Sequence, residues 1–169
     1  MINTLNEFYD AIKKEAKNSS AYINETGNII IYCQKKNNRI IGITSNGEWF
    51  VEIDTKFYLL KELKPFYKLI SILEIPFETI EEEINERFKM AEINFDARYI
   101  FPFYPIVERV FQKPQSLYWL ELAYSWYELL DDKQKYGLIP IIQDLNMNTK
   151  LSQKLRQKMR KSMNELRKS

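Results

Sequence analysis

The sequence predicts an α+β protein, and three patterns support that prediction. The chain opens with a helical stripe of apolar residues, continues with strand-like runs up to residue 54, and has helical periodicity from residue 55 onward. Strand-rich and helix-rich stretches that do not alternate along the chain are typical of α+β folds. A chain of 169 residues can bury a substantial core. We therefore expect one domain, residues 1–169, in which residues 1–54 and 55–169 share that core.

The first expected element is a helix near the N-terminus. Thr4 and Glu7 have the spacing of a capping box, in which each side chain bonds the backbone N–H of the other residue. Apolar side chains then recur on one helical face: Leu5, Phe8, Tyr9, Ile12 and Ala16. We expect this helix to end near Asn18.

An antiparallel meander of three or four strands is expected within residues 21–54. The strongest signal is Asn46-Gly47, which predicts a hairpin between residues 39–44 and 48–54. Apolar and polar residues alternate along the second of these strands, except that Phe50 breaks the alternation. The preceding run, residues 29–33, is apolar and ends in Cys33, so we expect this thiol to be buried.

From residue 55 the expected elements are helices. Pro65 and Pro76 interrupt the stretch 56–75. Residues 77–91 carry an inward stripe formed by Phe77, Ile80, Ile84, Phe88 and Ala91. Residues 95–104 are aromatic and broken by Pro102, so their pattern predicts no definite structure. Their rings form either part of the core, which is the usual place for aromatic residues, or an exposed anchor patch. A short helix is expected near 105–112.

Three further helices are expected at the C-terminus, and we expect the helices to stack as antiparallel pairs. Residues 116–131 are apolar nearly all round, with one polar stripe formed by Glu121, Ser125 and Glu128. Residues 138–146 follow, with Pro140 as a helix start or kink. The last helix, from Thr149, has one apolar side: Leu151, Leu155, Met159, Met163 and Leu166.

The composition argues against an enzyme. The chain has no histidine, one cysteine and four glycines. Histidine is the usual general base and the commonest metal ligand, so most nucleophilic and zinc or iron sites are excluded. The four glycines are scattered, so no glycine-rich phosphate loop is present. We expect no catalytic residues, no cofactor, no metal and no small-molecule substrate.

One alternative is a metal-dependent nuclease. Asp54-Thr55-Lys56 resembles the acid-x-Lys element of nucleases with a restriction-endonuclease-like core. Those sites also need an acid on the preceding strand or turn to share a Mg²⁺ ion, and residues 39–47 contain none. Asp54 and Lys56 therefore form at most a degenerate nuclease site, which lacks the second acid.

The expected cellular location of the protein and the charge distribution along its chain limit the kinds of partner that we expect. No basic residue precedes the first apolar positions, and no apolar run approaches the roughly 20 residues of a membrane span, so we expect a cytoplasmic protein without membrane contact. The lone cysteine suits a reducing compartment. Residues 150–169 hold eight basic residues and one acid, whereas the rest of the chain holds 17 basic and 22 acidic residues.

The basic tail and an acidic run suggest different partners. The tail would suit a regulatory protein that binds nucleic acid. It lacks the interleaved aromatics that single-strand binding uses, so we favour packing of its apolar side and expect no nucleic acid. The acidic run at residues 74–86 places Glu78, Glu82 and Glu86 one turn apart, an arrangement that costs helix stability. Either this face is simply solvated or it attracts a basic partner.

Two C-terminal segments carry a family resemblance. They comprise Trp119, Glu121-Leu122-Ala123, Trp126 and Glu128-Leu129-Leu130, then Lys150-Leu151-Ser152-Gln153-Lys154-Leu155-Arg156 and Lys158. The stretch Ser116–Ser169 thereby resembles the ending of small bacterial immunity proteins that accompany polymorphic or contact-dependent toxins. Gln157 stands where a histidine is expected in that family. The shared motif is a helix-packing pattern, so it assigns no binding residues.

The resemblance implies an immunity protein that binds and neutralises a cognate bacterial toxin. A nuclease is the toxin that an acidic patch fits best, because a nuclease must present basic residues to phosphate. We expect the carboxylates to steer this partner and aromatic side chains to anchor it. The steering residues are Glu78, Glu81, Glu82 and Glu86, and the anchors are Tyr99, Phe101, Phe103 and Tyr104.

Overall fold

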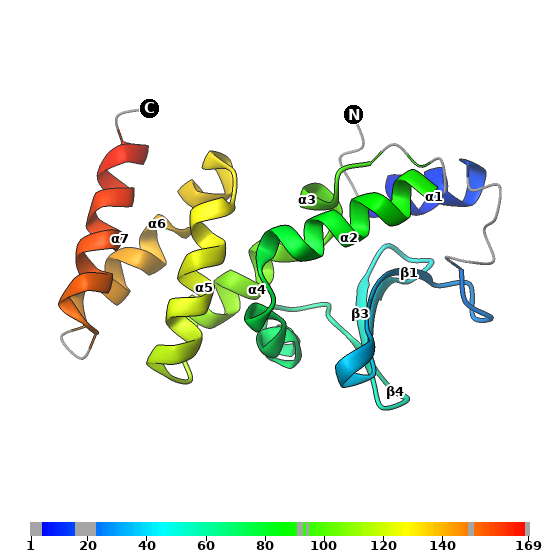
Figure 1. Cartoon of the computed structure of the whole chain (residues 1–169), viewed down its shortest axis with the longest axis horizontal. Coiled ribbons are helices and arrows are strands. Elements are labelled where there is room, and N and C mark those ends of the chain that lie inside the picture. Colours follow the sequence, from blue (N-terminus) through cyan, green and yellow to red (C-terminus); the bar gives the residue numbers. More distant parts are fainter. Residues whose placement is uncertain (1–4, 16–22, 91–92, 94, 149–150, 168–169) are drawn as a thin grey trace. The chain divides into compact units, whose positions relative to one another are not determined.

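An N-terminal helix, a four-stranded antiparallel sheet and a helical C-terminal half follow one another along the chain, which confirms the predicted α+β class (Figure 1). The computed structural model describes residues 5–15, 23–90, 93, 95–148 and 151–167. These residues form two compact units. Unit 1 comprises residues 1–69 and 75–102, and unit 2 comprises residues 70–74 and 103–169. The expectation of one domain with a shared core stays a prediction.

Unit 1 begins with helix α1, Leu5–Glu15. Its predicted stripe is buried at Phe8, Tyr9 and Ile12. The Phe8 ring contacts the rings of Phe88 and Phe95, with centroids 5.7 and 4.8 Å away. Thr4 and Ala16, which the sequence analysis assigned to the cap and the stripe, lie outside the described residues.

The sheet of unit 1 has its strands in chain order, each antiparallel to the next. They are β1 (Ile29–Gln34), β2 (Arg39–Ile43), β3 (Trp49–Ile53) and β4 (Lys56–Leu59). The predicted Asn46-Gly47 turn joins β2 to β3, with the Gly47 N–H donating to the Thr44 carbonyl at 2.9 Å. The meander was predicted to end at residue 54, and β4 extends it. Asp54 and Thr55 both have positive φ, 48° and 67°, and form the two-residue turn between β3 and β4.

A bulge in β1 overturns the expected burial of Cys33. The β1–β2 register shifts between Ile30 and Tyr32, so Ile31 has no partner on β2. Ile31 and Tyr32 are consequently both buried, and the side chain of Cys33 is exposed.

The two faces of the sheet have different environments. Helix α2 (Phe77–Met90) packs against β1, and Tyr32 on that face contacts the Phe101 ring at 5.8 Å. We call this the inner face, and the strand register places Ile29, Arg39, Ile41, Ile43, Val51 and Tyr58 on it. The outer face carries Ile30, Cys33, Ile40, Gly42, Phe50, Glu52, Phe57 and Leu59.

The stretch 56–75, expected to be helical, instead contains β4 and the 3₁₀ helix η3 (Lys64–Glu74). Pro65 lies in the first turn of η3, where its missing N–H costs little. In α2 the predicted stripe is buried at Phe77, Ile80, Ile84 and Phe88. Ala91 lies outside the described residues. The stretch 95–104 contains the short helix α3 (Ala97–Ile100) and the start of α4 (Phe103–Gln112).

Unit 2 contains α4, α5 (Leu117–Leu129), α6 (Asp132–Met147) and α7 (Gln153–Leu166). Each of the last three begins at a capping side chain: Ser116, Asp131 and Ser152. Helix α6 starts earlier than predicted and continues through Pro140. Helix α4 packs against α5 and α6, and α6 packs against α7 (Figure 1). The predicted apolar side of α7 is buried, and no described helix is long and apolar enough to span a membrane.

Candidate partner-binding surface

Helix α2 presents a row of carboxylates on the side opposite its buried stripe. Glu78, Glu82 and Glu86 follow one another at intervals of four residues and are exposed. We call these three residues the acidic face. Ile80, Ile84 and Phe88 are at most 1% exposed, so the core fixes the rotation of α2 about its axis. The direction of the acidic face is therefore set by core packing and does not depend on the carboxylates themselves.

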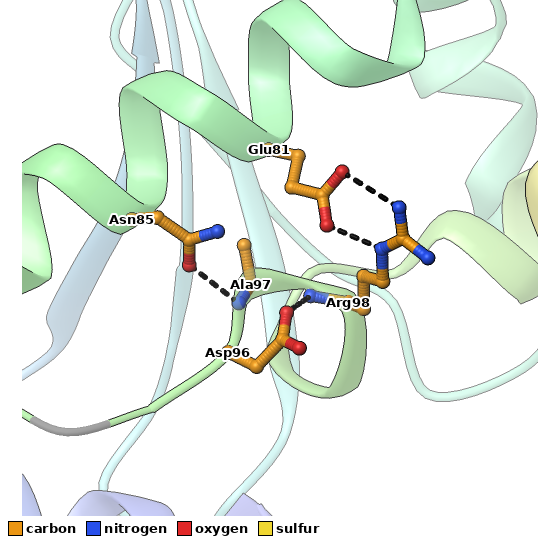
Figure 2. Close-up of polar contacts among 5 residues, drawn as sticks. All are labelled: Glu81, Asn85, Asp96, Ala97 and Arg98. Atoms are coloured by element: carbon orange, nitrogen blue, oxygen red, sulfur yellow. Dashed lines mark hydrogen bonds and ion pairs between the residues drawn. The ribbon is translucent and has the colours of Figure 1, made fainter.

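Glu81 is not part of the acidic face, because its carboxylate forms an ion pair with Arg98. The Nη2 group of Arg98 donates to Glu81 Oε2 at 3.1 Å, and Arg98 Nε donates to Oε1 (Figure 2). This bidentate contact raises the pKa of Arg98 above its usual value. Because Glu81 pairs with Arg98, it attaches α3 to α2, and its role as a steering charge stays a prediction.

One further hydrogen bond holds α3 against α2, and a second closes the N-terminus of α3 itself. The Ala97 N–H donates to Asn85 Oδ1 at 2.9 Å, and the Arg98 N–H donates to Asp96 Oδ1 at 2.8 Å (Figure 2). Asp96 is the N-cap of α3. Tyr99 on this anchored turn has 73% of its surface exposed. The structure thus places an exposed aromatic side chain on a turn that is attached to the helix carrying the acidic face.

We expect the substitution Asn85→Ala to lower the free energy of unfolding by about 1–2 kcal/mol, because it leaves the Ala97 N–H without its acceptor beside a buried residue. Urea denaturation measures the change. The neighbouring Glu86→Ala is the control, and as an exposed substitution it should stay within about 0.5 kcal/mol of the parent protein. Equal stability of the two variants would contradict the anchoring role of Asn85.

The other three predicted anchors are much less exposed than Tyr99. Phe101 and Phe103 are 3% and 1% exposed, so they are core residues, and their prediction as exposed anchors needs correction. Phe101 belongs to unit 1, whereas Phe103 packs in unit 2 against Trp126 with ring centroids 5.3 Å apart. Tyr104 is half-buried in unit 2, where burial raises the pKa of its hydroxyl. Of the four aromatic residues, Tyr99 alone is freely available to a partner.

Glu83 has a structural role that the sequence did not suggest. Its carboxylate interacts with the hydroxyl of Tyr32, which lies on the inner face of the sheet. Burial of Tyr32, together with the Glu83 charge, raises the pKa of this hydroxyl to about 12. Helix α2 therefore uses two of its carboxylates for internal contacts, Glu81 towards α3 and Glu83 towards β1.

The residues of the nuclease alternative lie at the β3–β4 turn. Asp54 and Lys56 are both exposed, and the left-handed conformation of Asp54 serves the turn. Within the described part of the chain, no group of three His, Cys, Asp or Glu side chains is arranged to hold a metal ion. The nuclease alternative remains a hypothesis without further support.

Unit 2 contains a groove between α5 and α7 that the sequence analysis did not predict. It has a volume of about 240 Å³ and is lined by Glu121, Tyr124, Ser125, Glu128, Ser152, Lys154, Leu155 and Lys158. The predicted polar stripe of α5 therefore forms one wall. Glu128 and Lys158 face each other across the groove at 3.9 Å, so its opposite charges partly satisfy one another.

Comparison of the chain with protein-family models, with curated proteins and with solved structures gives no match. The functional argument therefore depends on the geometry of the acidic face and on the chemistry that it favours.

Proposed function

We propose that this chain is a cytoplasmic immunity protein that binds and neutralises a cognate bacterial toxin, with a basic nuclease domain as the target. The observation that carries the proposal is the acidic face: three exposed carboxylates on a helix whose orientation the core fixes. Like charges at this spacing each cost a helix a few tenths of a kcal/mol. Attraction of a basic partner is a function that offsets this cost.

A nuclease toxin suits this face for an electrostatic reason. Any protein that cleaves nucleic acid presents lysine and arginine side chains to the phosphates of its substrate. A carboxylate row can approach those side chains in place of phosphate and thereby block access of the substrate. The long-range field of the row also accelerates the encounter, which suits an inhibitor that must act before its host is damaged.

Tyr99 supplies the apolar part of the proposed contact. Tyrosine buries a large surface on binding and loses little conformational entropy, so it is common among the residues that dominate binding energy. The turn that carries Tyr99 is fixed to α2 by the contacts of Arg98 and Asn85. The anchor and the charges are thus arranged before the partner arrives, which lowers the entropic cost of binding.

Charge reversal tests the site. The partner is the protein that the tagged chain captures from its own cell, and association is followed by stopped-flow fluorescence over a salt series. We expect the triple substitution Glu78→Lys, Glu82→Lys and Glu86→Lys to slow association by about tenfold or more at low salt and to flatten its salt dependence. The fold should persist, because no apolar contact is removed.

A matched control separates the acidic face from net charge. Asp132→Lys, Asp144→Lys and Glu165→Lys change the net charge equally at exposed positions of unit 2, and should leave association fast. If both triple variants associate equally, the assignment of the site is wrong. Expression of the captured partner in cells lacking this chain tests the function separately: a partner that does not impair growth would refute the immunity role.

A further inference from the structure

Strand β4 ends the sheet with an unpaired edge. The Leu60 N–H donates to the Trp49 carbonyl at 2.8 Å, and the register pairs Phe50 with Leu59 and Glu52 with Phe57. Because hydrogen bonding alternates along an antiparallel pair, the N–H and C=O groups of Phe57 and Leu59 point away from β3. No hydrogen bond to these backbone groups is found within the described ranges of the chain. They are free to pair with another strand.

The side chains of the same two residues are also exposed. Phe57 and Leu59 lie on the outer face of the sheet with 46% and 36% of their surfaces accessible. Phe57 stacks on Phe50, with ring centroids 4.9 Å apart and planes inclined by 23°. The usual outer face of a half-buried antiparallel sheet is polar. Here the edge offers apolar side chains beside its free backbone groups.

The segment that follows the β3–β4 turn carries more basic than acidic residues. The segment from residue 56 to residue 68 holds four lysines and one acid. Lys61 pairs with Glu48 at 2.9 Å. The Lys68 ammonium lies 3.7 Å from the ring centroid of Tyr58 on β4 and 4.9 Å from that of Tyr67. Neither Lys56 nor Lys68 forms an ion pair with a carboxylate in the part of the chain that the structure describes.

We propose that β4 is the docking strand for an extended, acidic segment of a second protein. The segment pairs through the N–H and C=O groups of Phe57 and Leu59, places alternate apolar side chains on the outer face, and directs carboxylates to Lys56 and Lys68. Strand addition of this kind gains affinity from backbone hydrogen bonds and specificity from alternate side chains. The surface is separate from the acidic face of α2, and its charge is opposite.

The same observations disfavour other occupants. In a second copy of this chain paired along β4, the lysines of one copy would repel those of the other. Single-stranded nucleic acid needs open aromatic faces for its bases. Here Phe50 covers one face of Phe57, and Lys68 lies over Tyr58. The unpaired N–H and C=O groups of β4 match the hydrogen-bonding pattern of an added strand, and neither of the other occupants needs them.

Amide hydrogen exchange measured by NMR tests the proposal on the full chain. The probe is a short peptide in which glutamate alternates with valine, and the control peptide has lysine in place of glutamate. We expect the glutamate peptide to protect the Phe57 and Leu59 amides. The Tyr58 and Leu60 amides, already bonded to β3, should change little. The double substitution Lys56→Glu and Lys68→Gln should weaken binding about fivefold or more.

A proline substitution tests the pairing itself. Leu59→Pro removes one outward N–H and leaves the bonds to β3, whereas Leu59→Ala removes only the side chain. Binding should be lost in Leu59→Pro and weakened in Leu59→Ala, with the Leu60 amide of both variants still protected. If proline unfolds the strand, the binding of the double variant Lys56→Glu and Lys68→Gln tests the docking proposal instead. Equal binding of both peptides, protection without peptide that increases with protein concentration, protection by an oligonucleotide, or no protection at all would overturn the proposal.

Discussion

Replacement of Gly42 by alanine is expected to destabilise the sheet by about 3 kcal/mol or more. A Cβ atom at this position would lie 2.1 Å from the Ile29 carbonyl oxygen and 2.6 Å from the Phe50 ring. Gly42 pairs with Ile30 on one side and Phe50 on the other, so β2 cannot move away from one neighbour without approaching the other. Overpacking of a fixed core costs about 1–3 kcal/mol, and a backbone clash adds to that cost.

Urea denaturation measures this effect, and Gly137→Ala provides the control. A Cβ atom at Gly137 in α6 would have the Tyr104 hydroxyl as its nearest neighbour, at 3.1 Å. A side-chain atom can shift by a few tenths of an ångström, and alanine gains about 1 kcal/mol of helix propensity over glycine. We expect Gly137→Ala to stay within about 1 kcal/mol of the parent protein. A Gly42→Ala protein as stable as Gly137→Ala would contradict the packing described here.

The second large effect is expected in unit 2. Trp126 is 1% exposed and meets Phe103 edge-to-face at 5.3 Å. Truncation of a buried tryptophan to alanine removes its apolar contacts and leaves a cavity, at a typical cost of about 3–5 kcal/mol. We therefore expect Trp126→Ala to lower the free energy of unfolding by that amount, with loss of the near-ultraviolet circular dichroism of the packed rings.

Tyr136→Ala is the matched control, because this aromatic residue of α6 is 54% exposed. Its truncation should change stability by no more than about 0.5 kcal/mol. The comparison also tests the reassignment of Phe103. If Phe103→Ala costs as much as Trp126→Ala, both residues belong to the core. If it costs as little as Tyr136→Ala, the original interpretation of Phe103 as an exposed anchor is restored.

Features that depend on one helix or one turn could be predicted from the local sequence. Apart from the half-buried Leu5, the described residues of the stripes of α1, α2 and α7 are buried as predicted, because helical periodicity places such residues on one face whatever covers it. The turn at Gly47 formed because glycine adopts positive φ at little cost. The exposure of Glu78, Glu82 and Glu86 follows from the same stripe, so the acidic face could be predicted from the helix alone.

The local sequence of strand β4 and of the turn before it hides this strand from prediction. The Asp54-Thr55 turn contains no glycine, although both residues adopt positive φ, a conformation that non-glycine residues rarely occupy. A four-residue strand is also too short to show a period, and Lys56-Phe57-Tyr58-Leu59 does not alternate between polar and apolar residues. Its pairing with β3 stabilises both the strand and the turn, and sequence patterns do not report pairing.

The α+β class, the N-terminal helix, the antiparallel hairpin and the acidic side of α2 could all be predicted from the sequence, because each follows from the period or turn chemistry of one segment. Tertiary structure alone decided which charges and rings remain available. Arg98 reaches Glu81 across seventeen positions of sequence and neutralises it. A bulge turned Cys33 outward, and packing buried Phe101 and Phe103 while leaving Tyr99 and Phe57 exposed. Contacts between segments set these outcomes, and a residue's own neighbours in sequence do not specify them.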